Sequence, residues 1–171
     1  MSVSQAAEAV ATLLQSTGRR LVLAESCTGG LVAATLAQIP GISDVLCGSV
    51  VVYRAATKAV WLGVDQRMLE DPAIGPVSAE VTRELALAVL DQTPEADLSA
   101  AVTGHLGPHA PTALDGVVHV AIAIRYPRLA IVAQVREVLT AAGPDPVASR
   151  VTRQQRATEL VLDTIAATLR G

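Results

Sequence analysis

Short apolar runs, separated by segments of helical periodicity, recur along the whole chain. The five runs rich in Val, Ile, Leu and Ala predict buried strands. They cover residues 20–24, 49–53, 98–102, 117–124 and 129–135. Apolar positions three or four residues apart predict helices around them. These helices cover residues 4–15, 29–38, 57–62 and 65–70, a stretch beginning near 77, and 145–169.

The order of these elements indicates the class of fold. Helices alternate with strands through the first hundred residues, whereas the last three strands follow one another almost directly. That order is typical of an α/β protein with a mainly parallel sheet, an antiparallel portion and helices on both faces. The chain of 171 residues shows no internal repeat or linker, so we expect residues 1–171 to form a single domain.

The last predicted helix has a clear start and an apolar stripe. Asp145 is a good N-cap residue, and Pro146 suits the first helical position. We expect one side of this helix to be buried, formed by Val147, Val151, Val161, Ile165 and Leu169. Its more polar faces should carry Arg150, Arg153 and Arg156.

The composition argues against several classes of protein. Apolar residues make up 51% of the chain, yet it has no Phe, one Trp and two Tyr, so the core must be aliphatic. The net charge of −3 and the lack of a basic stripe argue against a nucleic-acid partner. We find no run of about 18 apolar residues and no signal peptide, so we expect a cytoplasmic protein without a membrane partner. The two cysteines make neither a disulfide framework nor a paired metal motif.

The segment LAESCTGG at residues 23–30 carries the strongest sign of chemistry. It places Ser26, Cys27 and Thr28 where a buried strand turns into a helix, followed by two glycines. Backbone N–H groups at a helix start bind anions and can stabilise an oxyanion, and glycines let a ligand approach the backbone. A tight turn capped by Ser or Thr is the alternative interpretation. Cys27 is a second possible nucleophile, although a buried inert thiol is the commoner role.

Two further segments place polar residues at predicted strand ends. Tyr53 ends the second strand and Lys58 opens the next helix, while Thr103 and Gly104 follow the third strand. In open α/β sheets ligands collect at the carboxyl ends of strands, so Tyr53 and Thr103 are expected to share a site with Thr28. A helix start lowers the pKa of a lysine, as a lysine base requires. A solvated surface lysine is the alternative.

The three histidines do not suggest a metal site. His105 and His109 are four residues apart, a spacing that serves a metal only on a helix, and Pro108 argues against a helix there. His119 falls within a predicted strand. We therefore expect loop or packing histidines and no metal.

On these motifs the chain resembles the CinA C-terminal domain family, whose standalone members are nicotinamide-nucleotide amidohydrolases. Residues 24–30, AESCTGG, match the family's best-known motif without change. Residues 51–58 resemble its V-T-Y-S-N-x-x-K segment and keep Tyr53 and Lys58. Residues 101–104, AVTG, match the start of its A-V-T-G-I-A-G-P stretch. The resemblance covers nearly the whole chain.

The resemblance implies a three-layer α/β/α sandwich with a five-stranded mixed, mainly parallel sheet, assembled as a homodimer or larger homo-oligomer. It also implies hydrolysis of nicotinamide mononucleotide to nicotinic acid mononucleotide and ammonia, without metal or cofactor. Ser26 would be the nucleophile and Lys58, neutral through desolvation, its base. The residues expected to hold the oxyanion or the substrate are Thr28, Gly29, Gly30, Tyr53, Thr103, Gly104 and Arg150.

The chain departs from the family pattern around the predicted pocket. The family's I-A-G-P-G-G becomes HLGPHA at residues 105–110, and its K-P before the fourth strand becomes Leu114 and Asp115. Arg150 occupies the first arginine of the family's G-x-R-x-x-V-R pattern, whereas Gln154 stands at the second. Two alternatives therefore stay open. One is a CinA-like binding or assembly module with weakened catalysis, and the other is a Ser–Lys hydrolase of a different amide.

Overall fold

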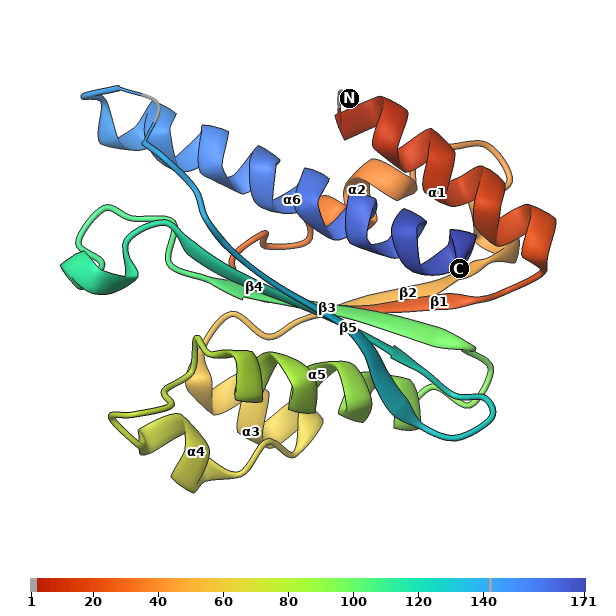
Figure 1. The fold of residues 1–171 in the computed structure, drawn as a ribbon, viewed down its shortest axis with the longest axis horizontal. Helices are drawn as coiled ribbons and strands as arrows, with labels where there is room; N and C mark the ends of the chain where they lie inside the picture. The colour runs from red at the N-terminus through yellow and green to blue at the C-terminus, as the bar shows by residue number, and fades with distance from the viewer. Residues whose placement is uncertain (1–2, 142) are drawn as a thin grey trace.

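The computed structural model describes residues 3–141 and 143–171, in which helices alternate with the first three strands, the last two strands follow without an α-helix between them, and a long helix ends the chain (Figure 1). The strands are β1 (Leu21–Glu25), β2 (Leu46–Val51), β3 (Leu98–Gly104), β4 (Val117–Ile124) and β5 (Ala130–Val138). The α-helices are α1 (Val3–Thr17), α2 (Leu31–Leu36), α3 (Ala55–Leu62), α4 (Gln66–Glu70), α5 (Ala79–Asp91) and α6 (Pro146–Arg170). Short 3-10 turns occur at Ile42–Asp44 and Thr112–Leu114.

The strands form one mixed sheet in the order β2-β1-β3-β4-β5. β1 pairs in parallel with both of its neighbours, whereas β4 pairs antiparallel with β3 and with β5. Four strands therefore run in one direction and β4 runs against them. This arrangement confirms the predicted α/β fold with a five-stranded mixed, mainly parallel sheet. Because β1, β2 and β3 are parallel, their carboxyl ends lie at the same edge of the sheet.

Helices cover both faces of the sheet and complete the three layers (Figure 1). α1, α2 and α6 lie on one face, and α3, α4 and α5 lie on the other. Successive strand residues point to opposite faces, so Leu21 and Leu23 enter the first core while Val22 and Ala24 enter the second. Two aliphatic cores, in a chain without Phe, thus hold the strand ends in place.

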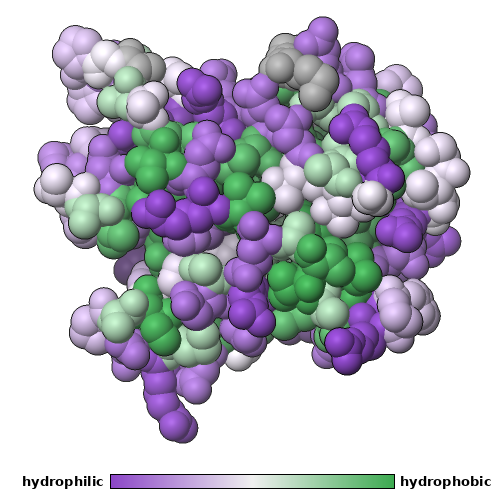
Figure 2. All heavy atoms as spheres, viewed as in Figure 1, coloured by the Kyte–Doolittle hydropathy of each residue, from purple (hydrophilic) through white to green (hydrophobic). Residues whose placement is uncertain are grey.

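The surface carries apolar residues in separate groups. On the face shown in Figure 2 they reach the surface in several places rather than as one continuous area. The exposed large apolar side chains are Tyr53, Val60, Trp61, Tyr126, Leu129, Val132, Val138, Val147 and Val151. Across residues 3–141 and 143–171, no helix combines the length and the apolar character that a membrane crossing requires.

Several predicted boundaries shift by a few residues. α2 spans only Leu31–Leu36, and not residues 29–38, because Gly29 and Gly30 adopt positive φ angles of 64° and 98° and precede the helix. The second strand begins and ends earlier than residues 49–53, because its pairing with β1 starts at Leu46.

The buried side of α6 is the main error in the predicted packing. Val147 and Val151 were expected in the core but are 69% and 47% exposed, whereas Arg153 is only 5% exposed. Near the start of α6 the side chains of Ser149 and Arg153 are buried instead. Arg153 can be buried there because its guanidinium donates hydrogen bonds to the Asp115 carboxylate and to backbone carbonyls. The prediction is correct further along the helix, where Val161 and Ile165 are buried and Leu169 packs against the same core.

Candidate active site

A cavity of about 320 Å³ lies at the carboxyl ends of the parallel strands. It brings together five residues that the sequence analysis selected, namely Ser26, Tyr53, Lys58, Gly104 and Arg150. Each of the first three strands contributes a residue to the cavity, since Ser26 follows β1, Tyr53 follows β2 and Gly104 ends β3. Lys58 comes from α3 and Arg150 from α6, on opposite sides of the sheet.

Ser26 is held at the end of β1 and lines the cavity. Its backbone N–H donates to the carbonyl of Val102 at 3.1 Å, which continues the pairing of β1 with β3 by one residue. The residue is 5% exposed and lines the cavity. Within the described residues the Ser26 hydroxyl forms no hydrogen bond, so it is available to a ligand.

Lys58 is the only lysine of the chain, in which every other basic side chain apart from histidine is arginine. It is 2% exposed, and its Nζ donates to the carbonyl of Pro76 at 2.7 Å. Burial lowers the pKa of Lys58 to about 8, an effect that the neighbouring Cys27 slightly opposes. A measurable fraction of the amine is therefore neutral near pH 7. Lys58 thus meets the condition for a base, which a surface lysine would not meet.

Cys27 also lines the cavity but is a poor nucleophile. Burial raises the pKa of its thiol to about 12, and the charge of Lys58 offsets this only in part. The reactive thiolate is therefore scarce at neutral pH. Gly104 packs directly against the Cys27 side chain, since a Cβ at Gly104 would lie 2.9 Å from both Cys27 Sγ and Val118 Cγ2. Gly104 is needed for close packing of the cavity floor.

The start of α2 is occupied by a carboxylate of the protein itself. Glu25 is 1% exposed, and its oxygens accept hydrogen bonds from the N–H groups of Gly30, Val32 and Ala33 at 2.9–3.1 Å. They also accept hydrogen bonds from the hydroxyls of Thr28 at 2.8 Å and Ser49 at 3.0 Å. A buried charge with this many donors is well stabilised, and it sits where the helix dipole favours an anion.

This arrangement corrects the sequence-based expectation for the oxyanion site. The N–H group of Gly30 belongs to Glu25, and that of Gly29 donates to the carbonyl of Ser26 at 3.1 Å. The Thr28 side chain points to Glu25 and lies outside the cavity lining. Gly29 and Gly30 therefore shape the turn through their positive φ angles and do not offer free donors to a substrate.

We predict that Glu25→Gln destabilises the fold by ~1–3 kcal/mol, because an amide cannot accept on both sides and loses charge-assisted bonds. The midpoint of urea unfolding measures the effect. Glu8→Gln is the matched control, since Glu8 is exposed on α1. Equal midpoints for the two variants would show that the Glu25 contacts contribute no net stability.

Thr103 has a structural role as well. It is fully buried, and its hydroxyl is 2.8 Å from the hydroxyl of Thr82 on α5. The contact joins β3 to α5 beneath the cavity, and Thr103 is not part of the cavity lining. The predicted contact of Thr103 with the substrate therefore gains no support from this geometry.

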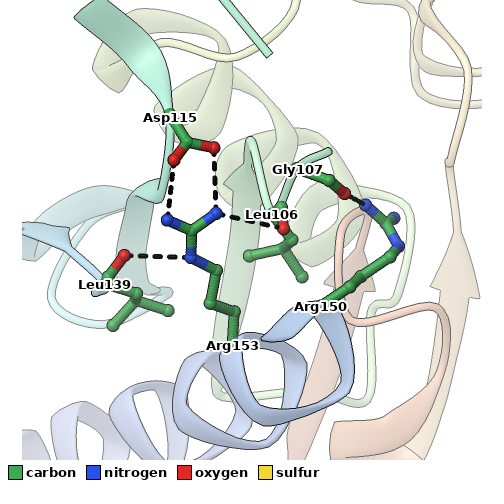
Figure 3. A network of polar contacts seen from close by, with 6 residues as sticks. All are labelled: Leu106, Gly107, Asp115, Leu139, Arg150 and Arg153. Carbon is green, nitrogen blue, oxygen red and sulfur yellow. Dashed lines mark hydrogen bonds and ion pairs between the residues drawn. The ribbon is translucent and has the colours of Figure 1, made fainter. Parts of the chain in front are cut away.

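The mouth of the cavity is formed by Tyr53, Arg150 and the segment after β3. One Arg150 Nη donates to the hydroxyl of Tyr53 at 2.6 Å, and the other donates to the carbonyl of Gly107 (Figure 3). Tyr53 is 54% exposed. Arg150 thus bridges two walls of the cavity while its guanidinium remains at the entrance.

Two histidines that were expected to serve loops or packing line the same cavity. They are His105 and His109, at the positions where the chain departs from the family pattern. Burial, and then the charge of Lys58, lower the pKa of His105. No Asp or Glu lines the cavity, so its ionisable side chains are basic or neutral. Among the described residues, no group of three or more His, Cys, Asp or Glu is placed to hold a metal ion.

The family model of the CinA C-terminal domain matches residues 3–165. The chain belongs to the CinA C-terminal domain family. Among similar sequences, a CinA-like protein of Gloeobacter violaceus is 43% identical over 119 residues, 68% of this chain and 27% of that protein. A CinA-like protein of Mycobacterium tuberculosis is 48% identical over 101 residues, 59% of this chain and 22% of that protein. The chain thus spans about a quarter of the length of these curated relatives.

Solved structures of the CinA superfamily share the fold over the whole chain. The competence or damage-inducible protein of Enterobacter asburiae superposes with a TM-score of 0.85 at 25% identity, covering 99% of both chains. The competence/damage inducible protein CihA of Agrobacterium tumefaciens gives 0.85 at 27% identity, covering 99% of this chain and 96% of that one. The chain therefore shares the fold of these structures over nearly its whole length.

Proposed function

We propose that this CinA C-terminal domain is a nicotinamide-nucleotide amidohydrolase that converts nicotinamide mononucleotide to nicotinic acid mononucleotide and ammonia through a Ser–Lys mechanism. The observation that carries the proposal is the lone lysine of the chain, buried in the cavity that also exposes the Ser26 hydroxyl. Arginine stays protonated in nearly any protein setting, whereas a buried lysine can lose its proton and act as a base.

In the first half of the reaction Ser26 Oγ attacks the carboxamide carbon of the substrate. The hydroxyl proton passes to the neutral amine of Lys58, and the carbonyl oxygen becomes an oxyanion. When the intermediate collapses, Lys58 returns the proton to the departing nitrogen, which leaves as ammonia. The product of this half is an ester between Ser26 and the nicotinoyl group. In the structure the Lys58 amine donates to Pro76, which leaves its lone pair free to receive the Ser26 proton.

In the second half water attacks the ester carbon while Lys58 takes a proton from it. The ester bond breaks, Ser26 Oγ recovers a proton from Lys58, and the product leaves as a carboxylic acid that ionises to the carboxylate by giving its proton to solvent or to the released ammonia. Lys58 is then neutral again, so one turnover consumes one water and releases one ammonia.

We assign the oxyanion to the backbone N–H groups of Cys27 and Thr28. They follow Ser26 directly, and among the described residues neither donates to another residue, the N–H of Cys27 contacting only its own thiol. An N–H group of the residue after the nucleophile is a common oxyanion donor in enzymes with a serine on a strand-to-helix turn. Glu25 supports this arrangement because its carboxylate accepts hydrogen bonds from the Thr28 hydroxyl and the Gly30 N–H, which hold the turn after Ser26 in place.

The charges around the cavity favour a substrate with an anionic group. Arg150 stands at the entrance, His105 and His109 line the wall, and no carboxylate faces the cavity. A guanidinium recognises a phosphate through paired N–H groups, so the phosphate of the mononucleotide belongs at Arg150. The carboxamide then extends inward to Ser26.

We predict that Arg150→Ala raises KM for nicotinamide mononucleotide by ~10-fold or more, because a charge-assisted contact with phosphate is lost. Nicotinamide has no phosphate, so its already poor kcat/KM should change little. Steady-state ammonia release with both compounds measures the effect, and Arg156→Ala, an exposed position on α6, is the control. An equal loss for both compounds would show that Arg150 only supports the cavity wall.

The proposed activity is tested by ammonia release from the mononucleotide and from a panel of other carboxamides. We expect hydrolysis of the mononucleotide with a kcat/KM well above that of nicotinamide. Preference for an unrelated amide would favour a different Ser–Lys hydrolase, consistent with His105 and His109 at the cavity wall. Tight binding of the mononucleotide without turnover would favour a binding module.

A further inference from the structure

Half of the cavity lining comes from one contiguous segment, residues 104–111. This segment opens the loop between β3 and β4, which we call the wall loop, residues 105–116. Its base continues the strand pairing, since the N–H of His105 donates to Val117 O and that of Gly116 donates to His105 O, both at 2.8 Å. Beyond this base, backbone pairing to the sheet ends.

Two arginines of α6 supply the side-chain hydrogen bonds between the wall loop and the rest of the described protein (Figure 3). Arg150 makes a single contact with the loop, through the carbonyl of Gly107, and its other contact is to Tyr53. Arg153, one turn later, reaches both ends of the loop. The two arginines therefore differ, because Arg150 faces the cavity and Arg153 does not.

Arg153 joins three parts of the chain through one buried guanidinium. Its Nη1 and Nη2 donate to the two carboxylate oxygens of Asp115 at 2.9 and 2.7 Å. Nη1 also donates to the carbonyl of Leu106 at 3.4 Å, and Nε donates to that of Leu139 at 3.0 Å. The guanidinium thus ties the start of the loop to its end, and ties both to the segment between β5 and α6.

The loop is shaped around this guanidinium. A Cβ at Gly107 would lie 2.9 Å from Arg153 Nη1 and 3.0 Å from Asp115 Oδ1. A Cβ at Gly116 would lie 2.2 Å from Leu139 O and 3.2 Å from Arg153 Nη2. Both glycines have positive φ angles, 65° and 78°. Side chains are thus missing where the ion pair and its carbonyl partner need the space.

We propose that Arg153 is a positioning residue of the active site: by joining Leu106 to Asp115 across the wall loop, it holds the wall that excludes water from Lys58 and places His105 beside it. Arg153 does not line the cavity, so it acts through the loop and does not contact the substrate. The inference rests on the proposed function in that the reaction requires Lys58 to lose its proton near neutral pH. The sequence predicts Arg153 on a polar face of the last helix, so the positioning role is inferred from the structure alone.

Burial links Arg153 to the chemistry of Lys58. Burial is the main cause of the lowered pKa of Lys58, and residues 104–111 make up half of the residues that line the cavity. Lys58 and His105 line this same cavity, and the charge of Lys58 contributes to the lowered pKa of His105. Loss of Arg153 leaves the carbonyls of Leu106 and Leu139 without their donor, so the loop must move or take up water. Water near Lys58 would raise its pKa toward the ordinary value.

The single lysine makes this testable without reference to any substrate. In protein labelled with ε-¹³C lysine, the NMR spectrum contains one side-chain signal, and its pH titration gives the pKa of Lys58. We expect Arg153→Met to raise that pKa by about one unit, which lowers the neutral fraction at pH 7, and hence kcat/KM there, by ~10-fold. Hydrogen exchange of residues 105–116 should quicken, while that of β1 and β3 stays unchanged. Arg153→Lys adds a second lysine, so its readout is hydrogen exchange. It should keep part of the parental protection of residues 105–116, because an ammonium can reach Asp115 but cannot pair with both carboxylate oxygens.

Two further variants keep the test decisive. Asp115→Asn removes the ion pair at a residue whose side chain is 43% exposed, so it should fold even if Arg153→Met does not, and it should shift Lys58 in the same direction. Arg156→Met is the matched control on the same helix and should change neither readout. The proposal would be overturned if folded Arg153→Met and Asp115→Asn showed the same hydrogen-exchange rates in the wall loop, and the same Lys58 pKa, as the parent protein. If both readouts shift but the parent does not hydrolyse the mononucleotide, the positioning role stands and the proposed function fails.

Discussion

Replacing Ser26 by alanine should reduce deamidation of nicotinamide mononucleotide by at least ~10⁴-fold in kcat, because removal of a nucleophile leaves only binding and oxyanion stabilisation. The fold should survive, since the Ser26 hydroxyl makes no hydrogen bond within the described residues and its backbone contact with Val102 is independent of the side chain. Ammonia release and the far-ultraviolet circular dichroism spectrum measure the two effects.

Cys27→Ala is the matched comparison for Ser26→Ala. Cys27 is the neighbouring residue of the same motif and lines the same cavity, but burial keeps its thiol protonated. We expect this variant to retain activity within a few-fold and to lose some stability through the small void it creates. Loss of activity in Cys27→Ala together with an active Ser26→Ala would exchange the roles of the two residues.

Replacing Lys58 by arginine should be nearly as damaging as replacing it by methionine, with a loss of at least ~10²-fold in kcat. Arginine keeps the charge but cannot accept the Ser26 proton. If Lys58 served only to attract a phosphate, arginine would instead cause a modest loss. Steady-state ammonia release by both variants, with folding checked for each, separates these possibilities.

The free energy of unfolding provides an independent measurement of the burial of Lys58. Because the pKa of Lys58 is lowered on folding, the unfolded chain holds more protons than the folded one between about pH 8 and the ordinary lysine pKa of 10.5. Stability should therefore rise with pH through this window, and the full penalty for burying the charge applies below about pH 8. Lys58→Met removes that penalty and should stabilise the fold at pH 7 by up to ~3 kcal/mol. An unchanged or lower urea midpoint for Lys58→Met would show that the lysine is not strained by burial.

Local patterns in the sequence were sufficient to predict the sheet, whereas the roles of Ser26 and Lys58 were predicted from the family resemblance. Strands and helices follow from apolar periodicity, and parallel pairing brings the ends of β1, β2 and β3 together. That is why Thr28, Tyr53 and Thr103, far apart in sequence, were expected to share a site. Of these only Tyr53 lines the cavity, together with Ser26 and Gly104, which lie near the other two in the chain.

Contacts between distant segments were beyond the reach of local patterns. Arg153 and Asp115 are 38 residues apart, and no spacing rule indicates that an arginine on an otherwise polar stretch of helix turns inward. The opposite holds for Glu25. A carboxylate just before a glycine-rich helix start suits the helix dipole, so the sequence contained the signal for its role, and for the loss of Gly30 as a free donor.

The dependence of kcat/KM on pH for hydrolysis of nicotinamide mononucleotide tests the Ser26–Lys58 account most directly. This parameter reports ionisations of the free enzyme and the free substrate, and the phosphate of the substrate titrates well below the range of interest. The account predicts that kcat/KM rises through one ionisation near pH 8, at the pKa of Lys58, and is level above it. A profile that is flat from pH 7 to 9, or that rises only near the ordinary lysine pKa, would contradict a neutral Lys58 as the base.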